Sequence, residues 1–146
     1  MAFEKTKSAG FLVNHLARLF ANQLAVEIAP LGLAPAQFMA LLELWAGDGL
    51  TQSDLVERLD VEQATLANTL VRMERDGLIV RTPHPEDSRA RLIWVTDLAR
   101  QLEGPAKSAA ARLNQQALSE LDEQAAETFL SSMRVVIATL RQIRAD

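Results

Sequence analysis

The apolar residues in the first third of the chain recur at the spacing of one helix face. Between residues 8 and 29 they return every three or four positions, and Pro30 and Gly32 then interrupt the pattern. Pro35 suits a first helical position and opens a second segment, which Gly47 closes. We therefore predict two helices in this part of the chain. The expected buried side of the second helix carries Phe38, Leu41, Leu42 and Trp45.

Two shorter helices are predicted next. Thr51 and Asp54 form a pair resembling a capping box, in which the hydroxyl and the carboxylate each accept a backbone N–H, so a third helix should begin just after Thr51. A brief turn at 60–62 leads to a fourth helix, and Gly77 is well placed as its left-handed C-terminal cap. Two helices joined by so short a turn have the proportions of a helix-turn-helix.

A β-hairpin is expected after the fourth helix. Residues 78–81 and 92–95 are short apolar runs that favour strands, and residues 82–91 form a polar loop between them. Trp94 is expected to pack within this hairpin. His84 lies between two prolines of the loop, where it is expected to be exposed to solvent or to contact a phosphate.

Two further helices complete the predicted mainly α fold. Thr96 can cap a fifth helix, which should be bent or interrupted near residues 104–105 because Pro105 removes a hydrogen bond and clashes with the preceding turn. A last helix from about Asp122 carries a narrow apolar seam like that of a coiled coil. The seam consists of Phe129, Met133, Val136, Leu140 and Ile143.

The fourth helix has two different faces. At 100° per residue, Leu66, Leu70 and Met73 form one buried stripe. The opposite arc carries Ala64, Thr65, Asn68, Val71, Arg72 and Arg75. Such a face suits a DNA major groove, since Asn can pair with adenine, Thr can contact a thymine methyl and Arg can reach guanine or phosphate. A solvated amphipathic helix without a ligand explains the same pattern, so this helix alone leaves the function open.

The charge of the chain argues only weakly for a nucleic-acid partner. The net charge is −4, with 15 Lys and Arg against 19 Asp and Glu. Residues 68–91 hold five arginines and four acids, a local balance of +1 that leaves −5 for the rest. Because phosphate neutralisation supplies most non-specific affinity for DNA, the case depends on which face each arginine occupies.

A ten-residue motif carries a family resemblance. Residues 87–96 read Asp-Ser-Arg-Ala-Arg-Leu-Ile-Trp-Val-Thr, which is similar to the signature D-x-R, a small residue and an apolar strand ending in Thr. This motif, with the helix pair and first strand before it, resembles the MarR (multiple-antibiotic-resistance regulator) family over roughly residues 11–143, the terminal helices by pattern only. The chain departs from the family at Ala34 and Glu62, where Ser or Thr caps are frequent, and at Ala99, where glycine is common.

The resemblance implies a winged helix-turn-helix that binds double-stranded DNA. It implies that Arg89 at the hairpin tip enters a minor groove and that Asp87 braces the arginines of the loop, in agreement with the enhanced negative potential of a narrow minor groove. We assign base reading to Gln63, Thr65, Asn68 and Thr69, and phosphate contact to Arg72 and Arg75. The whole predicted DNA-binding set is Gln63, Ala64, Thr65, Asn68, Thr69, Arg72, Arg75, Asp87, Arg89 and Arg91. A charged tip that merely keeps the protein soluble is the alternative.

The terminal helices are expected to join two copies of the chain. We predict a single MarR-like domain over 1–146, in which 1–32 and 100–146 are dimerisation helices and 35–99 is the winged helix-turn-helix lobe. A homodimer would bind a pseudo-palindromic operator with half-sites about one turn, roughly 34–36 Å, apart.

The predicted function is that of a sequence-specific transcriptional regulator. The resemblance favours a repressor that a small aromatic or anionic ligand releases from DNA. His15 and Arg18 could pair with an anion while Trp45 stacks beside it, although a purely interfacial role for His15 fits as well. The alternative function is a winged-helix adaptor that binds proteins and not DNA.

Other classes find little support in the composition. The chain has no cysteine and two histidines, so we expect no disulfide, thiolate metal site or cysteine redox switch. No Gly-rich phosphate loop occurs. We therefore predict no enzyme, no catalytic residues, no metal and no cofactor. The opening residues are charged and the apolar stretch after them is interrupted, which predicts a cytoplasmic protein without membrane contact.

Overall fold

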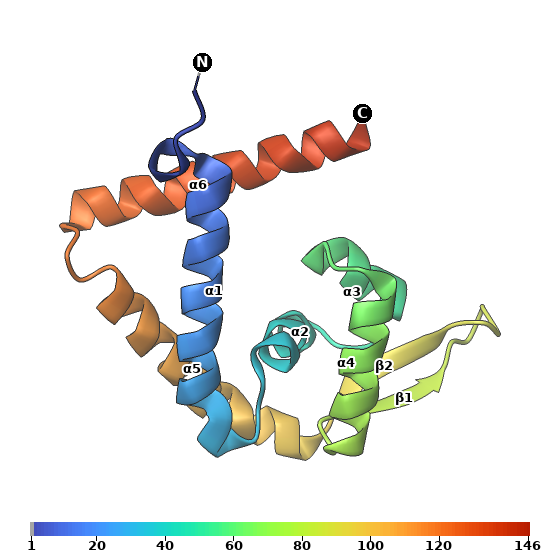
Figure 1. The fold of residues 1–146 in the computed structure, drawn as a ribbon. Helices are drawn as coiled ribbons and strands as arrows, with labels where there is room; N and C mark the ends of the chain where they lie inside the picture. Colours follow the sequence, from blue (N-terminus) through green and yellow to red (C-terminus); the bar gives the residue numbers. More distant parts are fainter. Residues whose placement is uncertain (1) are drawn as a thin grey trace. The chain divides into compact units, whose positions relative to one another are not determined.

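A computed structural model describes residues 2–146 and divides them between two compact units, residues 2–110 and Ala111–Asp146. Most of the chain is helical and the one sheet is a two-stranded hairpin, so the predicted fold class is confirmed (Figure 1). The elements are η1 (Lys5–Lys7), α1 (Ala9–Ile28), η2 (Ala29–Leu31), α2 (Pro35–Ala46), α3 (Gln52–Leu59), α4 (Gln63–Arg75), β1 (Ile79–Pro83), β2 (Arg91–Val95), α5 (Asp97–Ala117) and α6 (Glu123–Ala145).

The core of the first unit lies where α2, α4 and the hairpin meet. The predicted stripe of α4, Leu66, Leu70 and Met73, is buried, as are Phe38 and Leu41 of α2. Leu42 and Trp45, also expected on the buried side of α2, are half-buried against this core. One face of α4 is therefore anchored in apolar contacts, which leaves the opposite face turned outward.

The predicted capping box begins α3. The backbone N–H of Thr51 donates to the Asp54 carboxylate at 2.9 Å, and that of Asp54 donates to the Thr51 hydroxyl at 3.1 Å. The helix ends at Asp60, whose φ of 54° lies in the left-handed region that short polar side chains tolerate. This turn redirects the chain from α3 into α4 and completes the helix-turn-helix.

Gly77 ends α4 in the left-handed conformation expected of it, with φ 76°. Its N–H donates to the Glu74 carbonyl at 3.1 Å, and the N–H of Leu78 donates to the Met73 carbonyl at 2.9 Å. These two bonds define a Schellman motif. The motif satisfies the last carbonyls of α4 and turns the chain directly into β1.

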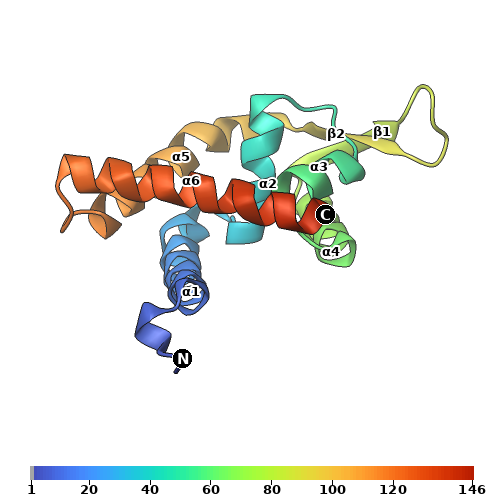
Figure 2. The same cartoon turned by 90° about the horizontal axis from the view of Figure 1, so that it is seen from above.

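The hairpin is longer than the sequence pattern predicts. The expected loop over 82–91 is wrong at both ends, because Thr82 pairs with Leu92 and Pro83 pairs with Arg91. Pro83 is tolerated there because it is the last residue of an edge strand, where its missing backbone N–H removes no hydrogen bond from the ladder. A bridge from Leu50 to Ile93 adds a short third segment beside β2. In Figures 1 and 2 the hairpin projects beyond α3 and α4.

Thr96 caps α5 and also joins it to the end of α4. Its hydroxyl accepts from the Ala99 N–H at 3.2 Å and donates to the Gly77 carbonyl at 2.7 Å. The helix then runs through Pro105 without a break, so of the two alternatives expected there the interruption is not present, and the bend stays a prediction. Ala106, immediately after the proline, is fully buried in the core, and this packing holds the helix together although one backbone hydrogen bond is missing.

The helix α6 begins at the predicted cap, where Asp122 accepts from the Ala125 N–H at 2.8 Å. Its apolar seam is largely uncovered in the single chain, with Leu140 60% exposed. The roles of the terminal helices in dimerisation stay predictions.

No single helix within residues 2–146 has both the length and the apolar composition to cross a membrane. The helices α1 and α2 reach that composition only as a pair, which a 73° bend separates.

Candidate nucleic-acid interface

The outward face of α4 carries most of the predicted DNA contacts. Six of the seven residues predicted on this helix are exposed to solvent: Gln63, Ala64, Thr65, Asn68, Arg72 and Arg75. Because the buried stripe fixes the rotation of the helix, these side chains are all directed away from the core. The face combines amides, a hydroxyl and two cations. Amides and hydroxyls can hydrogen-bond to base edges, and cations can pair with phosphates.

Thr69 does not share this face. Its side chain is only 9% exposed, and its hydroxyl donates to the Thr65 carbonyl at 3.1 Å. At 100° per residue it lies about 60° from Leu66, beside the buried stripe. The structure therefore corrects the expectation that Thr69 is presented with the other base readers.

A hydrogen-bonded network at the end of α4 holds Arg75. The Arg75 Nε lies 3.1 Å from one carboxylate oxygen of Asp76, and the Gln37 side chain donates to the other at 3.1 Å. The bond from Arg75, followed by that from Gln37, lowers the pKa of Asp76 below its ordinary value of 3.8, although burial acts in the opposite direction. Arg75 is thus held at the end of the face by a carboxylate that stays ionised.

The hairpin tip presents Arg89. Its side chain is 92% exposed, and its Nε lies 3.5 Å from the Asp87 carboxylate, which also accepts the Arg89 backbone N–H at 3.0 Å. Asp87 thus contacts the arginine that the resemblance implies it braces. The backbone N–H groups of Glu86 and Asp87 both donate to Nδ1 of His84.

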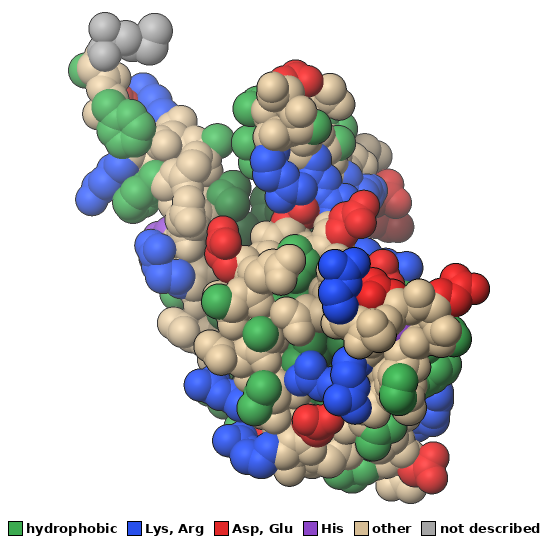
Figure 3. All heavy atoms as spheres, turned by 90° about the vertical axis from the view of Figure 1, so that its right-hand side faces the viewer, with side chains coloured by type: hydrophobic (Ala, Val, Ile, Leu, Met, Phe, Trp, Pro, Cys, Tyr) green, Lys and Arg blue, Asp and Glu red, His purple; other side chains and the backbone are tan. Residues whose placement is uncertain are grey.

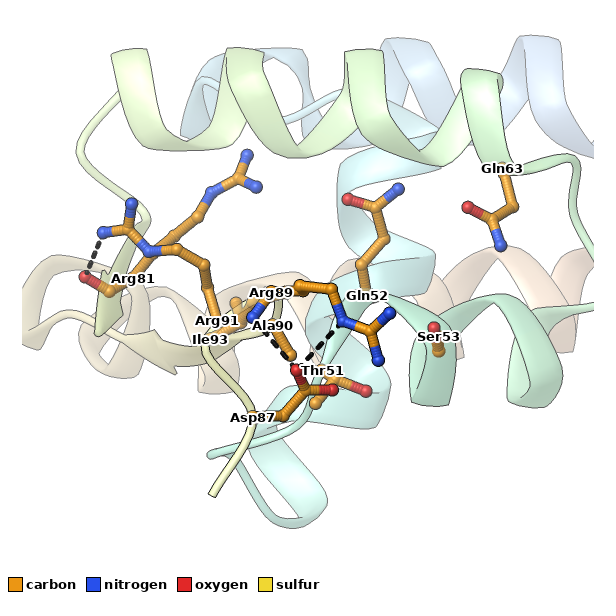
Figure 4. Close-up of a pocket in the computed structure, with 10 residues that line it drawn as sticks. All are labelled: Thr51, Gln52, Ser53, Gln63, Arg81, Asp87, Arg89, Ala90, Arg91 and Ile93. Atoms are coloured by element: carbon orange, nitrogen blue, oxygen red, sulfur yellow. Dashed lines mark hydrogen bonds and ion pairs between the residues drawn. The ribbon is translucent and has the colours of Figure 1, made fainter. Parts of the chain in front are cut away.

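The hairpin and the helix-turn-helix together line a cavity of about 570 Å³. Figure 4 shows its lining, which comes from the start of α3, the start of α4 and the hairpin. The lining residues are Thr51, Gln52, Ser53, Gln63, Arg81, Asp87, Arg89, Ala90, Arg91 and Ile93. Gln63, Asp87, Arg89 and Arg91 were predicted from the sequence. Thr51, Gln52 and Ser53 were missed, and their signal was a polar run at a helix start.

Arg81 is a further residue that sequence reasoning left out of the site. Its side chain is 18% exposed and lies 3.6 Å from Glu74 of α4, while its carbonyl accepts from Arg91 at 3.2 Å. Among the described residues, Arg81 Nε is buried without a hydrogen-bond partner. Arg81 thereby places a charge between the hairpin and α4, at the wall of the cavity.

Comparison with known proteins finds MarR-type regulators. The MarR family model matches residues 31–90, the segment that contains the helix-turn-helix, β1 and the hairpin loop. An organic hydroperoxide resistance transcriptional regulator of Bacillus subtilis is 36% identical over 87 residues, which are 60% of this chain and 59% of that protein. The chain is therefore similar to MarR-type regulators in this segment. It spans about three fifths of the length of this relative.

Solved structures of transcriptional regulators match nearly the whole chain. A probable transcriptional regulator from Pseudomonas aeruginosa is 28% identical with a TM-score of 0.81, covering 94% of this chain and 99% of its own. CouR, a transcriptional repressor solved on a 23-mer DNA duplex, is 28% identical with a TM-score of 0.78 over the same shares of the two chains. The predicted winged helix-turn-helix fold and the family resemblance are both confirmed.

The hairpin side of the chain carries mixed charge. Figure 3 looks onto that side, and Lys and Arg side chains gather there with Asp and Glu among them. Three of the arginines, Arg81, Arg89 and Arg91, line the cavity with Asp87 as its one acid. Within the described part of the chain, no group of three or more His, Cys, Asp or Glu could hold a metal ion.

The three residues predicted to bind an effector lie apart from this cavity. His15 and Arg18 are exposed on α1, where the His15 ring meets Phe11 edge-on at 6.1 Å. Trp45 is half-buried on α2, and its indole N–H donates to the Ala99 carbonyl at 3.0 Å. Its ring also lies 5.9 Å from Lys107 Nζ. Trp45 thus has a packing role that links α2 to α5.

Proposed function

We propose that this chain is a sequence-specific DNA-binding regulator in which α4 enters a major groove and Arg89 enters the adjacent minor groove. The observation that carries the proposal is the shared cavity, because Gln63 at the start of α4 and Arg89 at the hairpin tip line one hollow. A duplex that seats α4 would therefore meet the hairpin as well. The 28% identical CouR, a repressor solved on DNA, supports the same use of the fold.

Within this arrangement the residues divide by chemistry. Gln63, Thr65 and Asn68 read base edges, and the small Ala64 lets the helix approach the groove floor. Arg72 and Arg75 contact phosphates, as does Arg91 beside the cavity, and these contacts set affinity and register. Thr69 supports the helix instead, because its hydroxyl is bonded to Thr65.

The form that binds DNA is a homodimer. Large apolar side chains are exposed on α1 and along the α6 seam of the single chain, among them Leu19, Val26, Leu140 and Ile143. Several such residues at coiled-coil spacing need a partner to bury them. A second copy supplies one by symmetry, and the dimer binds two half-sites of a pseudo-palindromic operator.

Regulation is by repression that a small aromatic or anionic ligand relieves. His15 and Arg18 are exposed on α1 and are groups that would pair with a carboxylate, whereas Trp45 is a packing residue on α2. Such a ligand must prefer a dimer with unsuitable helix spacing, since equal affinity for both states shifts nothing. We assign the chain no catalytic activity, and we place it in the cytoplasm, where it reaches DNA.

Salt-dependent binding to duplex DNA tests the proposal. A DNA-binding dimer should lose affinity linearly in log–log coordinates as salt rises, and R89A should make that slope shallower. A protein-binding adaptor would show neither effect, and that result would reject the proposal. Titration of aromatic acids against an operator chosen from a random duplex pool tests the ligand: unchanged operator affinity across the panel would count against it.

A further inference from the structure

His84 organises the hairpin tip through its ring nitrogen. The backbone N–H groups of Glu86 and Asp87 donate to Nδ1 at 3.0 and 3.1 Å. Because Nδ1 accepts both bonds, the neutral imidazole carries its proton on Nε2. The ring thus takes the place that an Asn or Ser oxygen often has in a turn, and it fixes the backbone of residues 84–87.

The same turn continues into Arg89. Once its backbone is fixed, Asp87 accepts the Arg89 N–H at 3.0 Å and holds the Arg89 Nε at 3.5 Å. The Asp87 carbonyl also accepts the Ala90 N–H at 3.1 Å, and the His84 N–H returns to the Ala90 carbonyl at 3.3 Å. A closed set of contacts therefore runs from the His84 ring to the arginine at the cavity.

From this geometry we propose that His84 is a positioning residue, which sets Arg89 for the minor groove by way of Asp87. The inference rests on the proposed DNA-binding function. An exposed arginine samples many rotamers, and binding must then order it at an entropic cost. By holding Asp87 in place, His84 reduces that cost before DNA arrives.

The acceptor at Nδ1 distinguishes this role from a direct contact with DNA. An Asn at position 84 offers a side-chain acceptor of similar reach, so it should keep the turn and with it the placement of Arg89. Removal of the acceptor should loosen the tip and weaken DNA binding.

Three variants measured by fluorescence anisotropy on duplex DNA test the inference at constant pH and ionic strength. H84N keeps an acceptor near the Nδ1 position, H84A removes the acceptor, and R89A removes the arginine. H84A should bind roughly 3- to 10-fold more weakly than wild type, and H84N should recover most of that loss. H84A should add little loss to R89A, because both act through the same contact.

Each result that contradicts these expectations shows which proposal fails. Binding as weak in H84N as in H84A, or wild-type affinity in H84A beside a weakened R89A, overturns the positioning role alone. Unchanged binding in R89A overturns the wing contact of the proposed function and the positioning role with it. Thermal unfolding of H84A by circular dichroism should match wild type, since the loop lies outside the core.

Discussion

The side-chain amide of Gln37 donates a hydrogen bond to Asp76 at 3.1 Å and thereby joins the start of α2 to the end of α4. Gln37 is only 6% exposed, and its carbonyl oxygen accepts the Ala34 N–H at 3.0 Å. Both ends of this buried amide are therefore satisfied. The contact fixes the end of α4 that carries Arg75, next to the proposed phosphate contacts.

Acid should remove the stabilisation that Asp76 supplies. Bonds from Arg75 and Gln37 lower the pKa of Asp76, so its contribution is present above the ordinary value of 3.8 and disappears as the pH falls through the lower folded value. We expect D76N to be less stable than wild type at pH 7, with the difference narrowing toward pH 2. Urea unfolding at several pH values measures this, and parallel pH curves for the two proteins would refute it.

Two glycines with open space around them show the effect of backbone conformation without crowding. A Cβ on Gly77 would meet nothing closer than Leu98 at 3.9 Å, and one on Gly104 would meet nothing within 4 Å. Gly77 has φ 76°, whereas Gly104 lies inside α5. We expect G77A to cost about 1 kcal/mol in unfolding free energy because of the left-handed backbone, and G104A to add about 0.5–1 kcal/mol through helix propensity. Urea unfolding that shifted both variants in one direction would contradict this.

How much of the fold and of the site could be predicted from the sequence depends on how far apart along the chain the interacting residues lie. The capping box at Thr51 and the left-handed turn at Gly77 are set by residues within four positions, and both were predicted. The stripe of α4 follows from periodicity alone. Thr69 was misplaced because a residue 60° from the stripe can turn either way, and only the packed neighbours decide.

Contacts between distant segments were not predictable in the same way. Gln37 pairs with a residue 39 positions later, and Arg81 lies against Glu74 only after the chain has turned at Gly77. The continuity of α5 through Pro105 depends on the burial of Ala106, which no local pattern states. One feature of the sequence pointed to the role of His84. Its ring acceptor precedes the backbone N–H groups that it binds by two and three residues, which is the spacing of a side-chain turn.

Thr96 should be a sensitive point for the stability of the first unit. Its hydroxyl both caps α5 at Ala99 and donates to the Gly77 carbonyl, so one side chain serves two helix ends. T96A should cost about 1–2 kcal/mol in unfolding free energy, whereas T96S should retain most of it. Chemical denaturation of the three proteins checks the order, and equal losses in T96A and T96S would show that the hydroxyl is not responsible.

Base reading and phosphate contact should separate in two variants of α4. R72A should weaken binding to every duplex alike and reduce the salt slope by about 1, because it removes one phosphate contact. N68A should leave the slope unchanged and lose about 1–3 kcal/mol of preference for the selected operator over a scrambled duplex. Competition binding across a salt series measures both quantities. A sequence-dependent loss in R72A, or a uniform loss in N68A, would reverse the assignments.

The α6 seam offers a direct test of the homodimer. Leu140 is 60% exposed in the single chain, so L140E should leave the fold of the protomer intact. In a dimer the same glutamate would be buried in an apolar contact, which we expect to weaken association by roughly 100-fold or more. A138E is the matched control, because Ala138 lies about 160° from Leu140 around the helix. Light scattering coupled to size exclusion should find monomers for L140E and dimers for A138E. Dimers of L140E that resist dilution as wild type does would place the interface elsewhere.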